Sequence, residues 1–211
     1  MTAASNTSVL YTQRDLNCLS DPERNTRKRA LEKINKELDG FVKKPQEFTP
    51  DMAEECMTAL QKPLLKAFAD QAEKCRELSV LIVCTLLPAT RNPTAFARSL
   101  FPVIRQRIGT LPQEEESEEV RLGLLLLTKA AVACFEKSVG ESLDDLANIL
   151  EKASSDKFPD AKKVTSELVV EMCAREGGRV AEYCPPLVKA LQANLVHQQQ
   201  KIRSAALQAI G

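Results

Sequence analysis

The stretch Asp156–Cys173, DKFPDAKKVTSELVVEMC, decides the fold of this chain. It opens with a short turn, and apolar residues then recur every three or four positions, at Ala161, Val164, Leu168 and Met172. That spacing places their side chains on one face of an α-helix. Asp156 lies six residues before Lys162. The stretch therefore predicts a turn followed by an amphipathic helix.

The same frame occurs five times along the chain. In each frame a basic residue opens an apolar helix, and these residues are Arg27, Arg76, Arg121, Lys162 and Arg203. Their intervals are 49, 45, 41 and 41 residues. Six residues earlier stands an acidic residue in four frames and a histidine in the fifth: Asp21, Asp70, Glu115, Asp156 and His197. A period of about 40–47 residues is the signature of HEAT and armadillo helical repeats.

We expect these charged residues to form a structural ladder, in which each basic residue meets an acidic residue of its own turn or of a neighbouring turn. An exposed ion pair contributes about 0–1 kcal/mol, whereas removing one partner of a buried pair costs about 3–5 kcal/mol. The alternative for any single pair is ordinary helix capping by a solvated charge. The recurrence in five frames favours the ladder.

The predicted fold is all-α, a HEAT- or armadillo-like α-solenoid that forms a single domain over residues 1–211. About five helical hairpins are expected, the last of them incomplete, at residues 9–40, 50–88, 93–136, 140–175 and 179–211. Helices of this length are marginal alone in water, so stacked repeats must cover one another's apolar faces. We expect a truncated chain or a part of a longer array, because four apolar residues would lack a covering layer: Ile202, Ala205, Ala206 and Ile210.

Prolines and glycines mark the expected helix boundaries. Pro63, Pro102 and Pro186 are expected inside first helices of repeats, where each removes one hydrogen bond and kinks the helix. Gly40 is expected to end the helix over residues 23–38. A single helix is expected over residues 179–195, after the break at the two glycines that precede it.

Composition excludes several classes of protein. The formal net charge of the 211 residues is zero, so the basic excess that typifies nucleic-acid binders is missing. The sequence shows no apolar run of the length that a signal peptide or a membrane span requires. The seven cysteines are odd in number and form no CxxC pair, which favours a reducing compartment. We therefore expect a cytoplasmic protein with no nucleic-acid or membrane partner.

No residue set in the sequence predicts catalysis. The only histidine, His197, has Cys173 and Cys184 as its nearest cysteines, and the spacing matches neither a nucleophile pattern nor a metal site. Glycine-rich phosphate-binding motifs do not occur. We expect no catalytic residues, no cofactor, no metal and no small-molecule substrate. A cysteine-dependent enzyme is the alternative, and it would require a fast-reacting thiol.

Two second helices are apolar on nearly all sides, over residues 78–87 and 120–127. A helix of that kind must be covered by other groups. Either neighbouring helices pack tightly around it, or its exposed face forms a groove that holds a segment of a partner protein. On the second interpretation, Leu81 and Leu126 are the candidate groove residues.

The chain resembles the HEAT-repeat family in its repeat spacing, its acidic and basic positions, its prolines and its apolar stripes. Within that family it is similar to the axonemal-dynein assembly factors. Three segments carry this resemblance: RKRALEKINKEL at residues 27–38, FPDAKKVTSELV at 158–169 and CPPLVKALQANLVHQQQKIRSAALQAIG at 184–211. The resemblance implies a cytoplasmic, non-enzymatic scaffold for the pre-assembly of dynein arms of motile cilia. Its implied partners are axonemal dynein chains, chaperones and other assembly factors.

The alternative within the same fold is a generic HEAT-repeat adaptor of the phosphatase or transport type. Transport receptors of this kind are usually acidic, whereas this chain carries no formal net charge. Neither alternative supplies catalytic residues.

Overall fold

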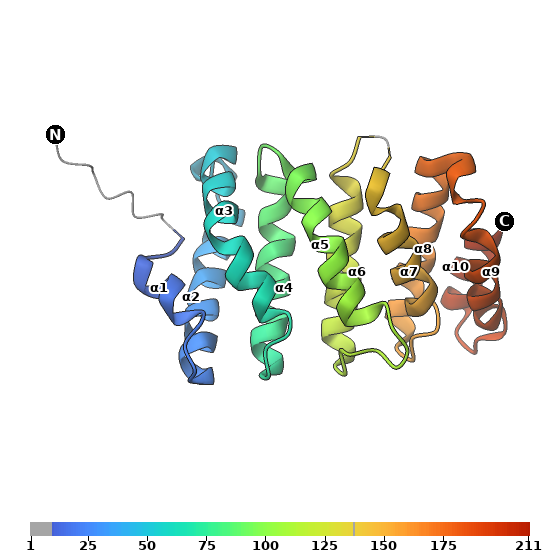
Figure 1. Ribbon diagram of the computed structural model, residues 1–211, viewed down its shortest axis with the longest axis horizontal. Helices are drawn as coiled ribbons and strands as arrows, with labels where there is room; N and C mark the ends of the chain where they lie inside the picture. Colours follow the sequence, from blue (N-terminus) through green and yellow to red (C-terminus); the bar gives the residue numbers. More distant parts are fainter. Residues whose placement is uncertain (1–9, 137) are drawn as a thin grey trace. The chain divides into compact units, whose positions relative to one another are not determined.

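The computed structural model describes residues 10–136 and 138–211, and all regular elements in them are helical. The α-helices are α1 Gln13–Cys18, α2 Arg24–Val42, α3 Pro50–Ala67, α4 Glu73–Leu86, α5 Pro93–Ile108, α6 Glu118–Ala133, α7 Leu143–Ala153, α8 Pro159–Glu176, α9 Cys184–Gln192 and α10 Gln200–Ile210 (Figure 1). Short 3-10 helices lie at Pro45–Glu47, Leu87–Ala89, Gly140–Ser142, Gly177–Val180 and Ala193–Val196.

The chain forms two compact units, one up to Pro93 and the other from Thr94 onwards. In the first unit, α1 packs on α2 and α3 packs on α4, and the two second helices α2 and α4 pack against each other. Leu31 and Ile34 of α2 are buried in this unit, together with Val83 of α4. The organisation of the whole chain as one domain of five repeats remains a prediction.

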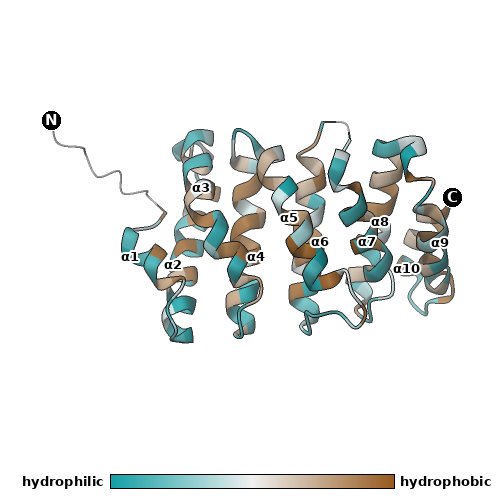
Figure 2. Cartoon of the chain, viewed as in Figure 1, coloured by the Kyte–Doolittle hydropathy of each residue, from teal (hydrophilic) through white to brown (hydrophobic). Residues whose placement is uncertain are grey.

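In the second unit, the second helices α6, α8 and α10 pack in a row. The first helices α7 and α9 contact each other, and each also packs on its own second helix, α8 or α10. The ring of Phe101 in α5 lies 6.2 Å from that of Phe135, which follows α6. Apolar residues line the middle of many helices, and hydrophilic residues gather at the turns (Figure 2).

The stretch that predicts the fold forms α8, and its buried face is wider than the spacing indicates. Ala161, Leu168 and Met172 are buried, but Val164 is only half-buried and Thr165 and Val169 are buried in addition. The reason is that α8 packs against three helices, α6, α7 and α10. The buried Thr165 hydroxyl donates a hydrogen bond to the Ala161 carbonyl at 2.8 Å, so the polar group is satisfied.

Two expected boundaries are wrong. Gly40 does not end α2, which continues to Val42, because Gly40 is not among the glycines with positive φ and so does not form a left-handed cap. The single helix expected over residues 179–195 is interrupted, and α9 begins only at Cys184. Pro186 consequently lies in the first turn of α9, where a proline is tolerated, whereas Pro63 and Pro102 lie inside α3 and α5.

Burial within α6 predicts a contrast in stability between two leucines of the same helix. Leu124 is fully buried, whereas 44% of Leu126 is exposed. Leu124→Ala should lower the free energy of unfolding by about 2–5 kcal/mol, because it removes packed methyl groups and leaves a cavity. Leu126→Ala, the matched control, should cost less than about 1 kcal/mol. Urea denaturation followed by circular dichroism measures both, and equal losses would contradict the described packing of α6.

Candidate functional site

The repeated basic residues lie in the first turns of the second helices, where each faces the turn that precedes its own helix. In the first unit, Arg27 Nη1 donates to the carbonyl oxygens of Asp21 and Pro22 at 2.8 and 3.0 Å. Its Nε and Nη2 donate to the two carboxylate oxygens of Asp70 at 2.6 and 2.8 Å. The arginine therefore binds its own turn through backbone oxygens and the next repeat through a bidentate ion pair.

Arg121 makes the same set of bonds in the second unit. Its Nη1 donates to the carbonyl oxygens of Glu115 and Glu116 at 3.2 and 2.7 Å. Its Nε and Nη2 donate to the carboxylate of Asp156, in the next repeat, at 2.7 and 3.0 Å. Only 1% of the Asp156 side chain is exposed. Asp156 also accepts from the Phe158 amide at 2.8 Å, so one carboxylate holds the turn before α8 and bonds Arg121 of α6.

Lys162 meets an amide instead of a carboxylate. Its Nζ donates to Asn194 Oδ1 at 2.6 Å and to the Ser154 carbonyl at 3.3 Å. Asn194 Nδ2 in turn donates to the same Ser154 carbonyl at 2.9 Å, and Asn194 is buried. Sequence analysis does not identify Asn194, because it lies three residues before the frame position of His197 and no carboxylate marks it.

The other frame residues also hold turns together. Arg76 Nη1 donates to the Asp70 carbonyl at 2.9 Å, and Arg203 Nη1 donates to the His197 carbonyl at 2.8 Å. Three side chains six residues ahead of the basic position accept a backbone amide two residues further on: Asp21 from Glu23, Glu115 from Ser117 and His197 from Gln199. These residues have a structural role in the turns, and none of the described bonds suggests chemistry on a substrate.

Ion pairing shifts the pKa values of Asp70 and Arg121 in the direction that strengthens their pairs. Burial by itself would raise the pKa of Asp70, but hydrogen bonds from the Arg27 guanidinium and the Ala72 amide outweigh it and lower the pKa. The hydrogen bond to Asp156 raises the pKa of Arg121. Burial lowers the pKa of Lys162, which has an amide rather than a carboxylate as its nearest acceptor.

Three of the second helices expose an apolar residue. Leu81 of α4 is 45% exposed in the first unit, and Leu126 of α6 is 44% exposed in the second. Val170 of α8, which sequence analysis does not identify, is 41% exposed. In the second unit, where α6 and α8 are neighbours, Lys129 Nζ of α6 donates to Glu167 of α8 at 2.8 Å. The exposed leucines and this ion pair lie on α4, α6 and α8, whose first turns hold the repeated basic residues Arg76, Arg121 and Lys162.

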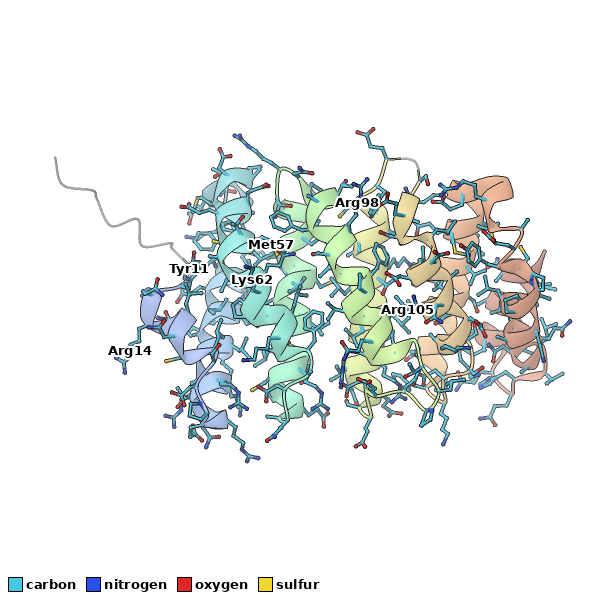
Figure 3. All side chains as sticks on the ribbon, viewed as in Figure 1. Tyr11, Arg14, Met57, Lys62, Arg98 and Arg105 are labelled. Carbon is cyan, nitrogen blue, oxygen red and sulfur yellow. The ribbon has the colours of Figure 1, made fainter. Side chains whose placement is uncertain are left out.

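A shallow cleft of about 350 Å³ lies on the first helices of the second unit. Arg105 of α5, labelled in Figure 3, lines it together with Asp144, Asn148 and Tyr183. The Tyr183 hydroxyl donates to Asp144, and this bond raises the pKa of Tyr183 to about 12. Because its pKa is raised, Tyr183 stays neutral, and its hydroxyl links the segment before α9 to Asp144 of α7. A neutral hydroxyl of this kind is not an activated nucleophile.

Four of the seven cysteines lack the lowered pKa of a reactive thiol. Burial raises the pKa of Cys75, Cys84, Cys134 and Cys173, which keeps these thiols protonated, whereas a nucleophile needs a lowered pKa. Within residues 10–136 and 138–211, no cluster of three or more histidine, cysteine or acidic side chains could hold a metal ion. Over the same residues, no helix is both long enough and apolar enough to cross a membrane.

The chain matches the sequence model of one protein family over residues 18–211. That family is described as "Dynein axonemal assembly factor 5-like, TPR repeats". Dynein axonemal assembly factor 5 of Xenopus laevis is 31% identical over 94% of this chain, and that of Homo sapiens is 27% identical over 88%. The chain spans 23% and 22% of these two relatives. The frame intervals of 41–49 residues are longer than the 34 residues of a TPR repeat and fit HEAT or armadillo repeats.

Solved structures with the same fold are armadillo-repeat proteins. A computationally designed armadillo repeat protein for modular peptide recognition aligns with a TM-score of 0.67 and 16% identity, over 93% of this chain and 79% of that one. A designed armadillo repeat protein in complex with the peptide (KR)4 aligns with a TM-score of 0.56 and 15% identity, over 94% and 98%. These likenesses establish the fold alone. The predicted all-α, armadillo-like solenoid is confirmed.

The Arg121–Asp156 bond predicts a large stability loss when one partner is removed. Arg121→Gln or Asp156→Asn alone should lower the free energy of unfolding by about 3–5 kcal/mol, because either change leaves a buried charge without its partner. Removing both should cost less than the sum of the two single losses. The exposed pair Arg105–Asp145 is the matched control and should cost at most about 1 kcal/mol. Urea denaturation of all variants gives the coupling energy, and additive losses would contradict the assigned bond.

The lowered pKa of Asp70 predicts acid-sensitive stability. Between the lowered native pKa and the ordinary value of about 4, the unfolded chain binds more protons than the folded chain. The stabilisation by Asp70 is therefore fully present above about pH 4 and is lost as the pH falls through the native pKa. Asp70→Asn should reduce the loss of unfolding free energy between about pH 5 and about pH 2. Asp51→Asn, from the exposed Arg91 pair, is the control, and an identical pH dependence of both variants would contradict the prediction.

Proposed function

The chain belongs to the dynein axonemal assembly factor 5-like family of helical-repeat proteins, and we propose that it acts as a non-enzymatic cytoplasmic scaffold in the pre-assembly of axonemal dynein arms of motile cilia. The observation that carries this proposal is the family match over residues 18–211, supported by the relative that is 31% identical over 94% of the chain. Because the chain spans less than a quarter of that relative, the activity and partners of the whole relative are part of the proposal.

A scaffold role fits the arrangement of the side chains. Charged groups of the frame are bonded between neighbouring repeats, as in Arg27–Asp70 and Arg121–Asp156, and partial burial raises the pKa of the Cys134 thiol. A partner protein would therefore bind the exposed side chains of the helices. Proteins built from repeats present equivalent helix positions in successive repeats, and such positions form binding surfaces. Surfaces of that kind suit the binding of proteins better than the binding of a small substrate.

The exposed apolar side of the second helices is the proposed contact surface of each unit, with Leu81 as the proposed contact residue in the first unit and Leu126 in the second. Each residue is nearly half exposed, although both of its neighbours in sequence are buried: Val80 and Ile82 beside Leu81, and Leu125 and Leu127 beside Leu126. Burying one such leucine against a partner contributes about 1.5–3 kcal/mol. In the second unit, Val170 of α8 is a further exposed apolar residue, and Glu167 of the same helix forms ion pairs with Lys129 and Lys163. Axonemal dynein chains, chaperones and other assembly factors are the proposed partners.

A generic protein-binding adaptor is the second candidate. It is supported by the designed armadillo repeat protein that was solved with a bound peptide, since that protein shares the fold. The two candidates differ in their partners and not in their surface. Identification of the bound proteins therefore separates them.

Affinity capture from the cytosol of ciliating cells tests the proposed function. The tagged chain should retain axonemal dynein chains together with chaperones, identified by mass spectrometry. Phosphatase subunits or transport cargo without dynein would contradict the assembly role and favour the generic adaptor. Capture from the cytosol of non-ciliated cells is the control for proteins that bind any helical repeat.

The same experiment with variants tests the surface. Leu81→Asp and Leu126→Asp should reduce the captured dynein chains at least about tenfold, because a loss of about 1.4 kcal/mol is tenfold in affinity. Val42→Asp is the matched control, since Val42 is also an exposed apolar residue but lies at the end of α2. Circular dichroism establishes that all three variants fold. If folded Leu81→Asp and Leu126→Asp retain every partner, the surface lies elsewhere.

A further inference from the structure

Two adjoining clefts of the second unit take no part in the contact surface proposed above. The first is the cleft of about 350 Å³ already described, and the second has a volume of about 490 Å³. Asp144 of α7 and Tyr183 line both clefts, so the hydrogen bond between these two side chains belongs to the walls of both. The clefts therefore form one continuous hollow in the surface of the second unit.

Carboxylates dominate the charged lining of the two clefts. The four acidic residues that contribute to it are Glu141, Asp144, Glu151 and Glu182. In the part of the chain that the structure describes, only Glu151 among these four forms an ion pair, with Lys152 at 2.8 Å. Asp144 is bonded by a neutral tyrosine hydroxyl, which leaves its charge uncompensated. The lining thus contains negative charge that no nearby cation neutralises.

The two arginines of the lining do not supply the missing positive charge, because each is already paired. Arg105 Nη1 bonds Asp145 at 2.8 Å, and Arg179 Nη1 bonds Glu176 at 3.0 Å. Neither of these two carboxylates belongs to the lining, so the arginine charges are offset from outside the clefts. The clefts consequently keep an excess of negative charge in a chain whose formal net charge is zero. A concave surface with one sign of charge attracts ligands of the opposite sign.

The first cleft also has the walls that a long basic side chain requires. Ala147 and Leu187 are buried apolar residues in its lining, and Pro186 adds a third apolar wall. The methylene groups of a lysine or arginine can lie along such walls while the charged end reaches the carboxylates. The aromatic ring of Tyr183 attracts a cation in addition. An anion would be repelled here, and a purely apolar group would desolvate the carboxylates without bonding them.

Asn148 provides an observation that is independent of the charges. It lines the first cleft, and its Oδ1 is buried and accepts no hydrogen bond. Buried polar atoms are bonded in the great majority of cases, so an unused acceptor at this place requires a donor. Half a turn of the side-chain amide exchanges its oxygen and nitrogen and would direct the acceptor into the cleft. An ammonium or guanidinium group in the cleft would then donate to it.

We propose that these two clefts bind a basic segment of a partner protein, with one lysine or arginine side chain in each cleft and Asp144 between the two. The clefts involve α5, α7 and α9, whereas Leu126 of the contact surface lies on α6, so the segment occupies a second binding surface. The proposal is independent of the proposed function, because it specifies the charge of the bound segment and not the protein that carries it.

Binding of defined peptides to the full chain tests the proposal. The probes are three fluorescein-labelled peptides, in each of which two arginines are separated by one, two or three serines. At least one should bind with a Kd of about 100 µM or tighter, measured by fluorescence anisotropy. The same peptide with citrulline, a neutral residue of similar shape, in place of arginine should bind at least about tenfold more weakly. If none of the three binds at about 1 mM, or if citrulline binds as well as arginine, the proposal is overturned.

Variants locate the bound peptide. Asp144→Asn should weaken binding at least about tenfold and Glu182→Gln at least about threefold, because Asp144 lines both clefts and Glu182 only the second. Asp160→Asn is the matched control, since it removes the same charge from an exposed ion pair with Lys201 on other helices of the unit. Leu126→Ala should also leave binding unchanged. Circular dichroism establishes that the variants fold. Equal losses in Asp144→Asn and Asp160→Asn would indicate general attraction between charges, and a loss only in Leu126→Ala would place the peptide on the contact surface; either result overturns the proposal.

The fluorescence of Tyr183 gives a second readout from within the clefts. The chain has two tyrosines and no tryptophan, so Tyr183 is the only emitter of its kind in the variant Tyr11→Phe. The unlabelled arginine peptide should change this emission over the same concentration range as the anisotropy, because a cation at Asp144 competes with the tyrosine hydroxyl for the carboxylate. Emission that stays constant while the peptide saturates the protein would place the peptide elsewhere and overturn the proposal.

Discussion

The bidentate bond between an arginine at the start of one second helix and a carboxylate in the next turn is the interaction on which the repeat structure depends. Hydrophobic burial is non-directional and would hold two amphipathic helices at more than one register. The planar guanidinium is directional, because one edge binds the carbonyl oxygens of its own turn and the other edge binds Asp70 or Asp156. Each carboxylate also accepts the backbone amide two residues further on, in the turn before the next helix. One bond thereby sets the position of two turns and the start of a helix.

This geometry determines which faces of the second helices are buried and which are exposed to solvent. In the first unit, Arg27 of α2 binds Asp70 of the next repeat, and α2 packs against α4. Leu31 and Ile34, four and seven residues after Arg27, are buried. The remaining side of the helix has no helix to cover it. Exposed apolar residues on that side, such as Leu126, are not needed for the core, because Leu124 and Leu127 already fill it. Such residues are the proposed contacts for a partner protein.

Much of the fold could be predicted from the sequence, since the frame recurs and the apolar residues follow a helical period. The errors occur where a local signal competes with a neighbouring helix. Gly40 is a common terminator, but α2 continues beyond it. The buried face of α8 includes Thr165, which periodicity of apolar residues cannot identify, because a threonine is buried only when its hydroxyl finds an acceptor in the same helix. Of the residues that hold the turns, Asn194 could not be predicted, because its partner Lys162 reaches it across 32 residues of sequence.

The sequence by itself determined the class of the protein: a helical-repeat chain with a period of 41–49 residues, a charged residue at the start of each second helix and no catalytic constellation. These properties depend on spacing and residue type, which are local. Only the tertiary structure decided which carboxylate each arginine binds. Asp21 is nearer to Arg27 in sequence, yet it offers its carbonyl oxygen while its side chain accepts the Glu23 amide, and the distant Asp70 supplies the carboxylate. The physical reason is that a turn of six residues brings a backbone oxygen to the guanidinium, whereas the free edge of the fork points away from that turn and can be reached only by a neighbouring repeat.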